Sequence, residues 1–178
     1  MTPRPDAIRA PGPYALVLES ATRAVVEVGR LGRIQLRRGF YVYVGSALGP
    51  GGLQARIGRH LDPRRTIHWH IDYLKHATRI VEIWYVADPV RREHAWARAL
   101  GDLSDASIPL PGFGASDCRC AAHLVHFPTA PRLATFARVL GRTRGAGAGP
   151  YRVFRPASAP NHFSPPTGNR GASSTGTR

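Results

Sequence analysis

Short apolar segments rich in leucine and valine alternate with polar residues along the first part of the chain. The first two segments cover residues 14–18 and 23–28, and the mostly polar residues 19–22 separate them. Two such runs joined by a short polar stretch are typical of antiparallel strands, so we predict a β-hairpin. Residues 29–32 begin and end with glycine and turn the chain into a third segment at residues 33–37.

The strongest strand pattern follows as a run of alternating aromatic residues and valines. Successive side chains of a strand point to opposite faces. Phe40, Val42 and Val44 therefore share one face, and Tyr41 and Tyr43 share the other. This strand offers an aliphatic side to a core and a phenolic side to a candidate site.

Further along the chain the apolar spacing lengthens to three or four residues, which predicts a helix. Leu53, Ile57 and Leu61 repeat at this spacing. Arg56 and His60 are four residues apart, so they lie together on one face of the same helix.

A second strand and helix complete the pattern. Residues 79–86 are rich in β-branched and aromatic residues and predict a strand. Residues 91–100 predict a helix with Ala95, Trp96 and Ala99 facing inward. This order of elements predicts an α+β fold, with a small mixed or antiparallel sheet flanked by helices.

The length fits one compact domain with less ordered ends. We place the domain at residues 12–128 and a C-terminal helix at residues 129–142. Residues 1–11 contain three prolines, and residues 143–178 consist mainly of Gly, Ala, Pro, Ser, Thr and Arg. Such segments bury too little apolar surface to offset the entropy of ordering, so we expect both ends to be disordered.

The chain carries a formal net charge of +14, and its basic residues are 24 arginines and the lysine Lys75. Beyond Asp117 there are nine arginines and no Asp or Glu. Such an excess of positive charge is typical of proteins that bind the phosphate backbone of nucleic acids, provided that the charge gathers on one face. GC-rich coding also produces much Arg, Ala, Gly and Pro. No run of 18 apolar residues and no export signal occurs, so we expect a cytoplasmic protein without membrane contact.

Two tripeptides carry the chemistry, at residues 12–14 (Gly-Pro-Tyr) and 43–45 (Tyr-Val-Gly). Arg56 and His60 follow on the first predicted helix, and Glu93 stands on the later one. Tyrosine, arginine and a carboxylate are residue types that phosphodiester hydrolysis uses. The arrangement resembles the GIY-YIG nuclease superfamily, which has an Arg-x-x-x-His or Arg-x-x-x-Tyr step on its first helix and a metal-binding acid on a later helix.

Three segments narrow this resemblance. They are residues 45–47 (Gly-Ser-Ala), 68–74 (His-Trp-His-Ile-Asp-Tyr-Leu) and 112–123 (Gly-Phe-Gly-Ala-Ser-Asp-Cys-Arg-Cys-Ala-Ala-His). They are similar to an uncharacterised prokaryotic branch of the superfamily, whose members occur alone or fused to endonuclease III. Together the motifs cover residues 12–127. The resemblance implies DNA as substrate and a DNA-repair protein as a partner.

The resemblance also implies a role for each catalytic residue. Tyr43 or Tyr14 takes a proton from water, Arg56 holds a nonbridging phosphate oxygen, and Glu93 binds Mg²⁺ or Mn²⁺ near the leaving group. His60 polarises a tyrosine or relays its proton. A phenol with a pKa of about 10 is a poor base at neutral pH, so we expect Arg56 and His60 to stabilise the phenolate.

We assign nucleic-acid contacts to Ser46, Arg59, His68, Trp69 and His70. In an extended segment the two histidines that flank Trp69 share one face, where they brace the wall of the site or contact phosphates. Metal ligation by this pair is an alternative. Trp69 either stacks on a base or, in the interpretation we favour, packs over the first helix.

Cys118, Cys120 and His123 form a Cys-x-Cys-x-x-His motif. A disulfide between residues two apart is geometrically awkward and does not suit a reducing compartment. Two thiolates and an imidazole are ligands for Zn²⁺. His94 is a candidate fourth ligand, because the related branch commonly has Cys at this position. The alternative is that two buried thiols pack a loop.

The chain departs from the family pattern in three places. Pro13 replaces the usual aliphatic residue, and three residues are inserted between residues 48 and 52. No Asn precedes Asn161, so a supporting role that some relatives give to Asn near the metal acid falls to Asp117 or Ser116.

Together these features predict a Mg²⁺-dependent DNA endonuclease that is structure-selective or directed by a repair partner. The main alternative is a catalytically silent nucleic-acid-binding module with the same fold. A third is a zinc-stabilised protein-interaction domain with incidental charge.

Overall fold

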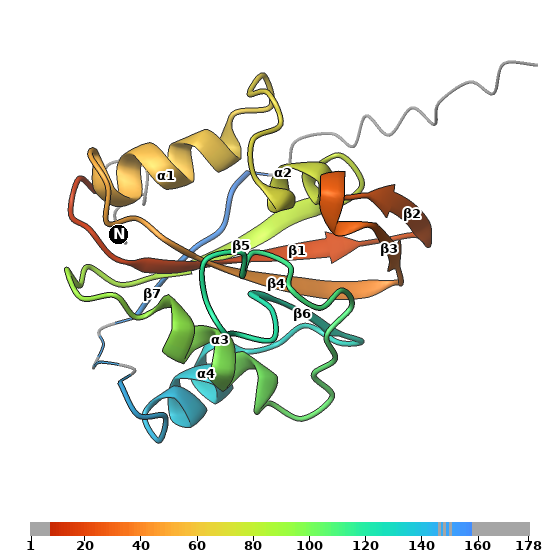
Figure 1. The fold of residues 1–178 in the computed structure, drawn as a ribbon. Helices are drawn as coiled ribbons and strands as arrows, with labels where there is room; N and C mark the ends of the chain where they lie inside the picture. The colour runs from red at the N-terminus through yellow and green to blue at the C-terminus, as the bar shows by residue number, and fades with distance from the viewer. Residues whose placement is uncertain (1–7, 146, 148, 150, 158–178) are drawn as a thin grey trace, which may run out of the picture.

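A five-stranded antiparallel sheet forms the middle layer of the molecule (Figure 1). The computed structural model describes residues 8–145, 147, 149 and 151–157. The strands lie in the order β6-β4-β1-β5-β7, so β1 is central. Their bounds are β1 (Pro13–Ser20), β4 (Gly39–Ser46), β5 (Arg79–Tyr85), β6 (Leu124–Phe127) and β7 (Arg152–Phe154). The predicted α+β class is confirmed, and the sheet is antiparallel throughout.

Helices cover both faces of this sheet (Figure 1). One face carries α1 (Gly52–Leu61) and α2 (His70–Lys75), and the other carries α3 (Glu93–Gly101) and α4 (Leu133–Leu140).

Alternate residues of β1 therefore enter two separate cores. Tyr14, Leu16 and Leu18 belong to the core beneath α1 and α2, which we call the first core. Ala15 and Val17 belong to the second core, beneath α3 and α4. The central strand thus joins both halves of the molecule.

The two faces of β4 are as predicted. Tyr41 and Tyr43 belong to the first core, whereas Phe40, Val42 and Val44 belong to the second. The predicted inward faces of the helices are also confirmed, because these side chains are buried: Leu53, Ile57, Ala95, Trp96 and Ala99.

The predicted hairpin of the first two segments is wrong. β1 pairs with β4 and β5, while β2 (Ala24–Glu27) pairs with β3 (Arg33–Leu36) in a separate two-stranded sheet. The 3₁₀ turn η2 (Gly29–Leu31) joins β2 and β3. Burial explains the difference. β1 is buried on both faces and needs a partner along each edge, whereas β2 alternates between half-buried and exposed positions.

The ends of the chain are more ordered than predicted over the described residues. Residues 152–154, assigned by the sequence to a disordered tail, form β7 at the edge beside β5. At the amino end, the carbonyls of Ile8 and Ala10 accept hydrogen bonds from the backbone of α1. The predicted C-terminal helix exists as α4, over shorter bounds than residues 129–142. Residues 1–7, 146, 148, 150 and 158–178 of the predicted disordered ends lie outside the described residues.

Within the described part of the chain, no helix has the length and apolar character required to cross a membrane.

Candidate functional site

A cleft of about 440 Å³ lies where the end of β4 meets α1, α3 and the loop at residues 112–123. Ser116 and Asp117, the two candidates for the role of the missing Asn, line it. The lining also includes most of the predicted site: Tyr43, Ser46, Arg56, His68, Trp69, His70 and Glu93. The fold therefore gathers residues from distant parts of the sequence around one opening.

Tyr14 and His60 lie behind the cleft. Neither is among the described residues that line it. Each is only 2% exposed. The Tyr14 hydroxyl is 2.8 Å from Nε2 of His60, and the His60 ring meets the ring of Tyr43 edge-on. This buried polar pair links β1 to α1 beside Tyr43. Nδ1 of His60 is buried and has no hydrogen-bond partner among the described residues.

Burial sets the protonation of these three rings. Burial raises the pKa of Tyr14 well above its usual value, and it raises the pKa of Tyr43 to about 12, although the charge of Arg56 lowers both. Burial also lowers the pKa of His60 to about 3, and the charge of Lys75 adds to this effect. At neutral pH both phenols are therefore protonated and the imidazole is neutral.

The electrostatic role that we predicted for His60 is wrong, because the imidazole is neutral. The sequence predicts positive charge from both Arg56 and His60 beside the phenols, but a neutral imidazole supplies none. Arg56 acts in the predicted direction, and burial outweighs its effect on Tyr43. His60 instead gives Tyr14 an uncharged hydrogen-bond partner.

Close packing explains two glycines of the tripeptides. Tyr14 lies opposite Gly45 across β1 and β4, and a Cβ at Gly45 would overlap the Tyr14 hydroxyl. A Cβ at Gly12 would overlap the carbonyl oxygen of Val86. The missing side chains thus let the two tripeptides and the end of β5 approach each other.

The Trp69 indole packs against α1, as we favoured from the sequence. The guanidinium carbons of Arg56 and Arg59 lie 4.4 and 4.5 Å from its ring centroid, which is cation–π geometry. Arg56 also lines the cleft, and it takes part in none of the ion pairs between described residues. Its charge therefore remains available to an anion.

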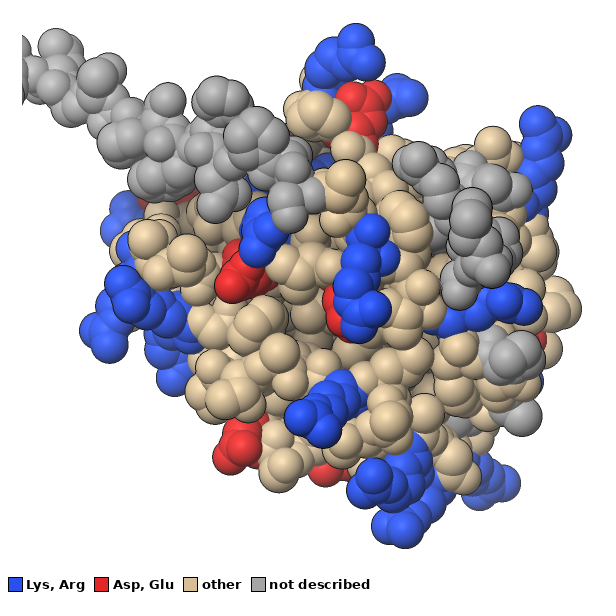
Figure 2. Space-filling model, turned by 180° about the vertical axis from the view of Figure 1, so that it is seen from behind, with Lys and Arg blue, Asp and Glu red and all other residues tan. Residues whose placement is uncertain are grey.

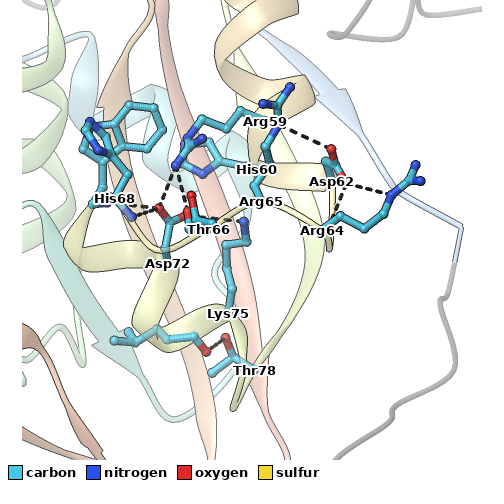
Figure 3. A network of polar contacts seen from close by, with 12 residues as sticks. Arg59, His60, Asp62, Arg64, Arg65, Thr66, His68, Asp72, Lys75 and Thr78 are labelled. Atoms are coloured by element: carbon cyan, nitrogen blue, oxygen red, sulfur yellow. Dashed lines mark hydrogen bonds and ion pairs between the residues drawn. The ribbon is translucent and has the colours of Figure 1, made fainter.

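Arg59, a predicted contact to nucleic acid, is directed into the protein instead (Figure 3). Its side chain is 20% exposed. Nη2 donates to the carbonyl oxygen of Thr66 at 3.0 Å and lies 3.5 Å from Oδ2 of Asp72. Arg59 is not among the described residues that line the cleft.

Asp72 holds the cleft wall in place, a role that the sequence reasoning missed. Its Oδ2 accepts hydrogen bonds from the backbone amides of His68 and Trp69, each at 3.0 Å, and its Oδ1 lies 3.4 Å from Nζ of Lys75 (Figure 3). Burial acts to raise the pKa of Asp72, but the two amides and Lys75 together hold it below its usual value. The bond from the Trp69 amide to Asp72 is one half of a helix capping box. The sequence lacks the signature of the box, because the Trp69 indole cannot accept a hydrogen bond as a Ser or Thr at this position would.

His70 ties this wall to the opposite loop. The backbone amide of Gly114 donates to His70 Nδ1 at 3.2 Å. An amide can only donate, so Nδ1 accepts and the ring carries a proton on Nε2. Neither His68 nor His70 belongs to the potential metal-ligand group found among the described residues.

Glu93 is 4% exposed and contributes to the cleft lining. Its Oε1 lies 3.1 Å from Nη1 of Arg91 and 3.6 Å from Nε2 of His94. Its Oε2 is buried and has no hydrogen-bond partner in the described part of the chain. Arg91 also lines the cleft, although it is not among the predicted site residues. In the sequence, the feature that connects Arg91 to the site is its position two residues before Glu93.

His94, Cys118, Cys120 and His123 come together as predicted. One donor atom from each lies within 4.8 Å of all the others, so the cluster could hold a metal ion. Sγ of Cys118 is 3.4 Å from Nε2 of His123, and Sγ of Cys120 is 3.5 Å from Nδ1 of His94. Both cysteines are free thiols. The pKa of the Cys120 thiol is raised to about 11. Burial is the main cause, and the neighbouring Cys118 raises this pKa further.

Positive charge is spread over the face seen in Figure 2. Lys and Arg side chains form several separate groups there, with Asp and Glu among them and uncharged surface between. On this face the charge does not form the single patch that would by itself indicate a nucleic-acid interface.

Comparison with known proteins identifies the family. No curated protein and no solved structure gives a significant match to the chain. The family model described as a domain of unknown function, DUF123, matches residues 13–144. This match covers well over half of the 178 residues, including the cleft and the His/Cys cluster. The chain therefore belongs to the DUF123 family of domains of unknown function.

Proposed function

We propose that this protein is a GIY-YIG-type endonuclease that hydrolyses phosphodiester bonds in DNA. The observation that carries the proposal is one cleft lined by Tyr43, Arg56 and Glu93, with the hydrogen-bonded pair Tyr14–His60 behind it. A phenol, a guanidinium without an ion pair among the described residues, and a buried carboxylate match the requirements of phosphodiester hydrolysis.

In this proposal each side chain acts on the phosphate or on the attacking water. Arg56 donates to a nonbridging oxygen, and its position over Trp69 limits the motion of the guanidinium. Tyr43 contacts the water, and Arg56 lowers the pKa of its phenol against the effect of burial. Tyr14 and His60 form a neutral hydrogen-bonded pair that holds the Tyr14 phenol in place beside Tyr43.

Glu93 fits a role as ligand to Mg²⁺ or Mn²⁺. Mg²⁺ is usually held by one or two carboxylates together with substrate phosphates and water. The buried Oε2 of Glu93, which has no hydrogen-bond partner within the described residues, and the carboxylate of Asp117 in the same cleft provide such ligands. When bound, the ion would stabilise negative charge on the phosphoryl and leaving oxygens.

We propose Zn²⁺ for the cluster of His94, Cys118, Cys120 and His123, because two sulfurs and two imidazoles are a donor set typical of zinc. A cytoplasmic location, which keeps the thiols reduced, and association with a DNA-repair protein belong to the same proposal.

One observation favours a second candidate function, a catalytically silent module that binds nucleic acid. Burial raises the pKa of both candidate phenolic bases, so neither is ready to accept a proton at neutral pH. The cleft would then bind a phosphate backbone through Arg56 and Ser46 without cutting it.

Cleavage of a labelled DNA panel in the presence of Mg²⁺ separates these functions. The panel contains duplex, single-stranded, flap, branched and abasic DNA, and the variants are Arg56→Ala and Glu93→Gln. Arg33→Ala and Glu27→Gln are matched controls, because these two exposed residues pair with each other on the small sheet.

For an enzyme, each cleft variant should lower kcat by about 100-fold or more while DNA binding changes only a few-fold. The controls should cleave at the wild-type rate. Tight binding without cleavage by the wild type supports the silent module. Negligible binding to every DNA form at physiological salt overturns both and favours a protein-interaction domain.

A further inference from the structure

The cluster of His94, Cys118, Cys120 and His123 lies next to the candidate catalytic carboxylate. We infer that Zn²⁺ bound by these four residues fixes the start of α3 against the loop 112–123 and thereby presents Oε2 of Glu93 to the cleft. The inference of a zinc site depends only on the four side chains of the cluster. The inferred role of Glu93 rests on the proposed function.

Two of the donor pairs already have the spacing of a tetrahedral site, and all four donor atoms lie within 4.8 Å of one another. Zn–S bonds of about 2.3 Å and Zn–N bonds of about 2.0–2.1 Å place a sulfur and a nitrogen about 3.6 Å apart at the tetrahedral angle. The pair Cys118 and His123 measures 3.4 Å, and the pair Cys120 and His94 measures 3.5 Å. Four protein ligands complete the coordination of Zn²⁺, so the site is of the closed, structural kind.

The cluster joins the start of α3 to the long irregular loop that precedes β6. Residues 102–123, between α3 and β6, contain no helix and no strand of the main sheet. Loops of this length within a compact domain usually have a specific function or constraint. His123 also connects the loop to the sheet, because its carbonyl accepts a hydrogen bond from the amide of Val44 at 2.9 Å. A bound ion would therefore fix α3, the loop and β4 relative to one another.

The orientation of His94 connects this site to Glu93. His94 faces the cluster with Nδ1, so its Nε2 is free to face Oε1 of Glu93 at 3.6 Å. Metal-bound histidines commonly donate their second ring N–H to a carboxylate, which fixes both groups. Arg91 approaches the same Oε1 at 3.1 Å. Oε1 is thus held by Arg91 and His94, and Oε2 is left without a partner among the described residues.

Elemental analysis and cobalt substitution test the zinc site directly. Wild-type protein purified without chelator should contain one zinc per chain. Its Co²⁺ form should show the intense visible bands of tetrahedral cobalt and a thiolate charge-transfer band. Cys120→Ser and His94→Ala should lose the ion. His94→Cys should retain it, because a Cys₃His set also binds zinc, and Glu93→Gln should retain it because Glu93 supplies no ligand.

The His94→Cys variant keeps the test decisive if Cys120→Ser fails to fold. One zinc in wild type, His94→Cys and Glu93→Gln, with loss in His94→Ala, supports the site. Absence of zinc from metal-replete wild type, together with a Co²⁺ spectrum lacking charge-transfer bands, overturns it.

Mn²⁺ binding tests the connection to Glu93 without relying on catalysis. Mn²⁺ binding is followed by electron paramagnetic resonance in zinc-loaded wild type, in zinc-loaded Glu93→Gln and in the zinc-free His94→Ala variant. Loss of an outer-shell partner typically weakens metal affinity 10- to 100-fold. We expect His94→Ala to raise the Kd for Mn²⁺ by about 10-fold and Glu93→Gln to raise it further.

Equal Mn²⁺ affinity in wild type and His94→Ala overturns the connection. Wild type that binds zinc and Mn²⁺ as expected but cuts no DNA overturns the nuclease proposal while the inference stands. The two failures are therefore distinguishable.

Discussion

At the residue scale, Gly45 controls the position of Tyr14. A Cβ at this position would overlap the Tyr14 hydroxyl, so Gly45→Ala should displace the phenol from Nε2 of His60. We expect a loss of about 1–3 kcal/mol of stability from overpacking, measured by urea unfolding, and reduced DNA cleavage. Gly101→Ala is the control, because a Cβ there meets no atom within 4 Å and alanine favours a helix. Equal stability of Gly45→Ala and wild type would contradict the contact.

His60 should make the stability of the protein depend on pH. Its pKa is about 3 in the folded protein and about 6.5 when unfolded. Between these values the unfolded chain binds the extra proton, so stability is full above pH 6.5 and falls as the pH is lowered toward 3, by up to about 1.4 kcal/mol per pH unit. The charged or titratable groups that surround the imidazole are Tyr14, Tyr43, Arg56, Arg59, Asp72 and Lys75.

Denaturant unfolding of wild type and His60→Gln between pH 7 and pH 4 measures this effect. The glutamine can keep a hydrogen bond to Tyr14 but does not titrate. We expect a clearly flatter dependence in the variant. Parallel curves for the two proteins would mean that His60 is not buried in its neutral form.

The residues of the site were easier to predict from the sequence than their chemical states. Tyr43, Arg56 and Glu93 could be picked out as candidates because their motifs resemble a family pattern, and all three line one cleft. The neutral state of His60 could not be found in this way. It depends on burial beneath residues from β1, β4 and α2, which only the fold brings together. The inward turn of Arg59 toward Asp72 has the same origin.

At the scale of elements, local patterns identified strands and helices but not all their neighbours. The pattern at residues 14–18 is apolar at nearly every position, which indicates a strand buried on both faces. Such a strand belongs at the centre of a sheet, and β1 indeed lies between β4 and β5. Chain proximity favoured the hairpin instead. β7 was missed because its three residues follow a stretch rich in glycine and alanine.

Removing β7 should destabilise the whole sheet. Val153 packs on the second core, Phe154 packs on the first, and Arg155 pairs with Glu82 of β5. A chain that ends at residue 145 should therefore be about 2–4 kcal/mol less stable in urea than one that ends at residue 157. The longer truncated chain is the matched control, since it keeps β7. Equal unfolding free energies would show that this edge strand contributes nothing.

At the scale of the whole molecule, the net charge of +14 makes us expect that the proposed DNA binding weakens as salt rises, by an amount set by the number of phosphate contacts. Residues 158–178 contain Arg170 and Arg178 and no acidic side chain. If these arginines contact phosphates, each adds about 0.9 to the slope of log K against log salt concentration. The chain that ends at residue 157 should then show a slope smaller by up to about 2 and weaker binding at low salt.

Fluorescence anisotropy with a labelled duplex across a range of NaCl concentrations measures both slopes. Arg33→Ala in the full-length chain is the control, because it removes one exposed positive charge that already pairs with Glu27 on the small sheet. Its slope should stay close to that of wild type, since a paired charge away from the cleft displaces few counterions. Identical slopes for the full-length and shortened chains would assign all phosphate contacts to residues 1–157. The cleft arginines Arg56 and Arg91 would then be the first to substitute, because both face the site where the phosphate is proposed to bind.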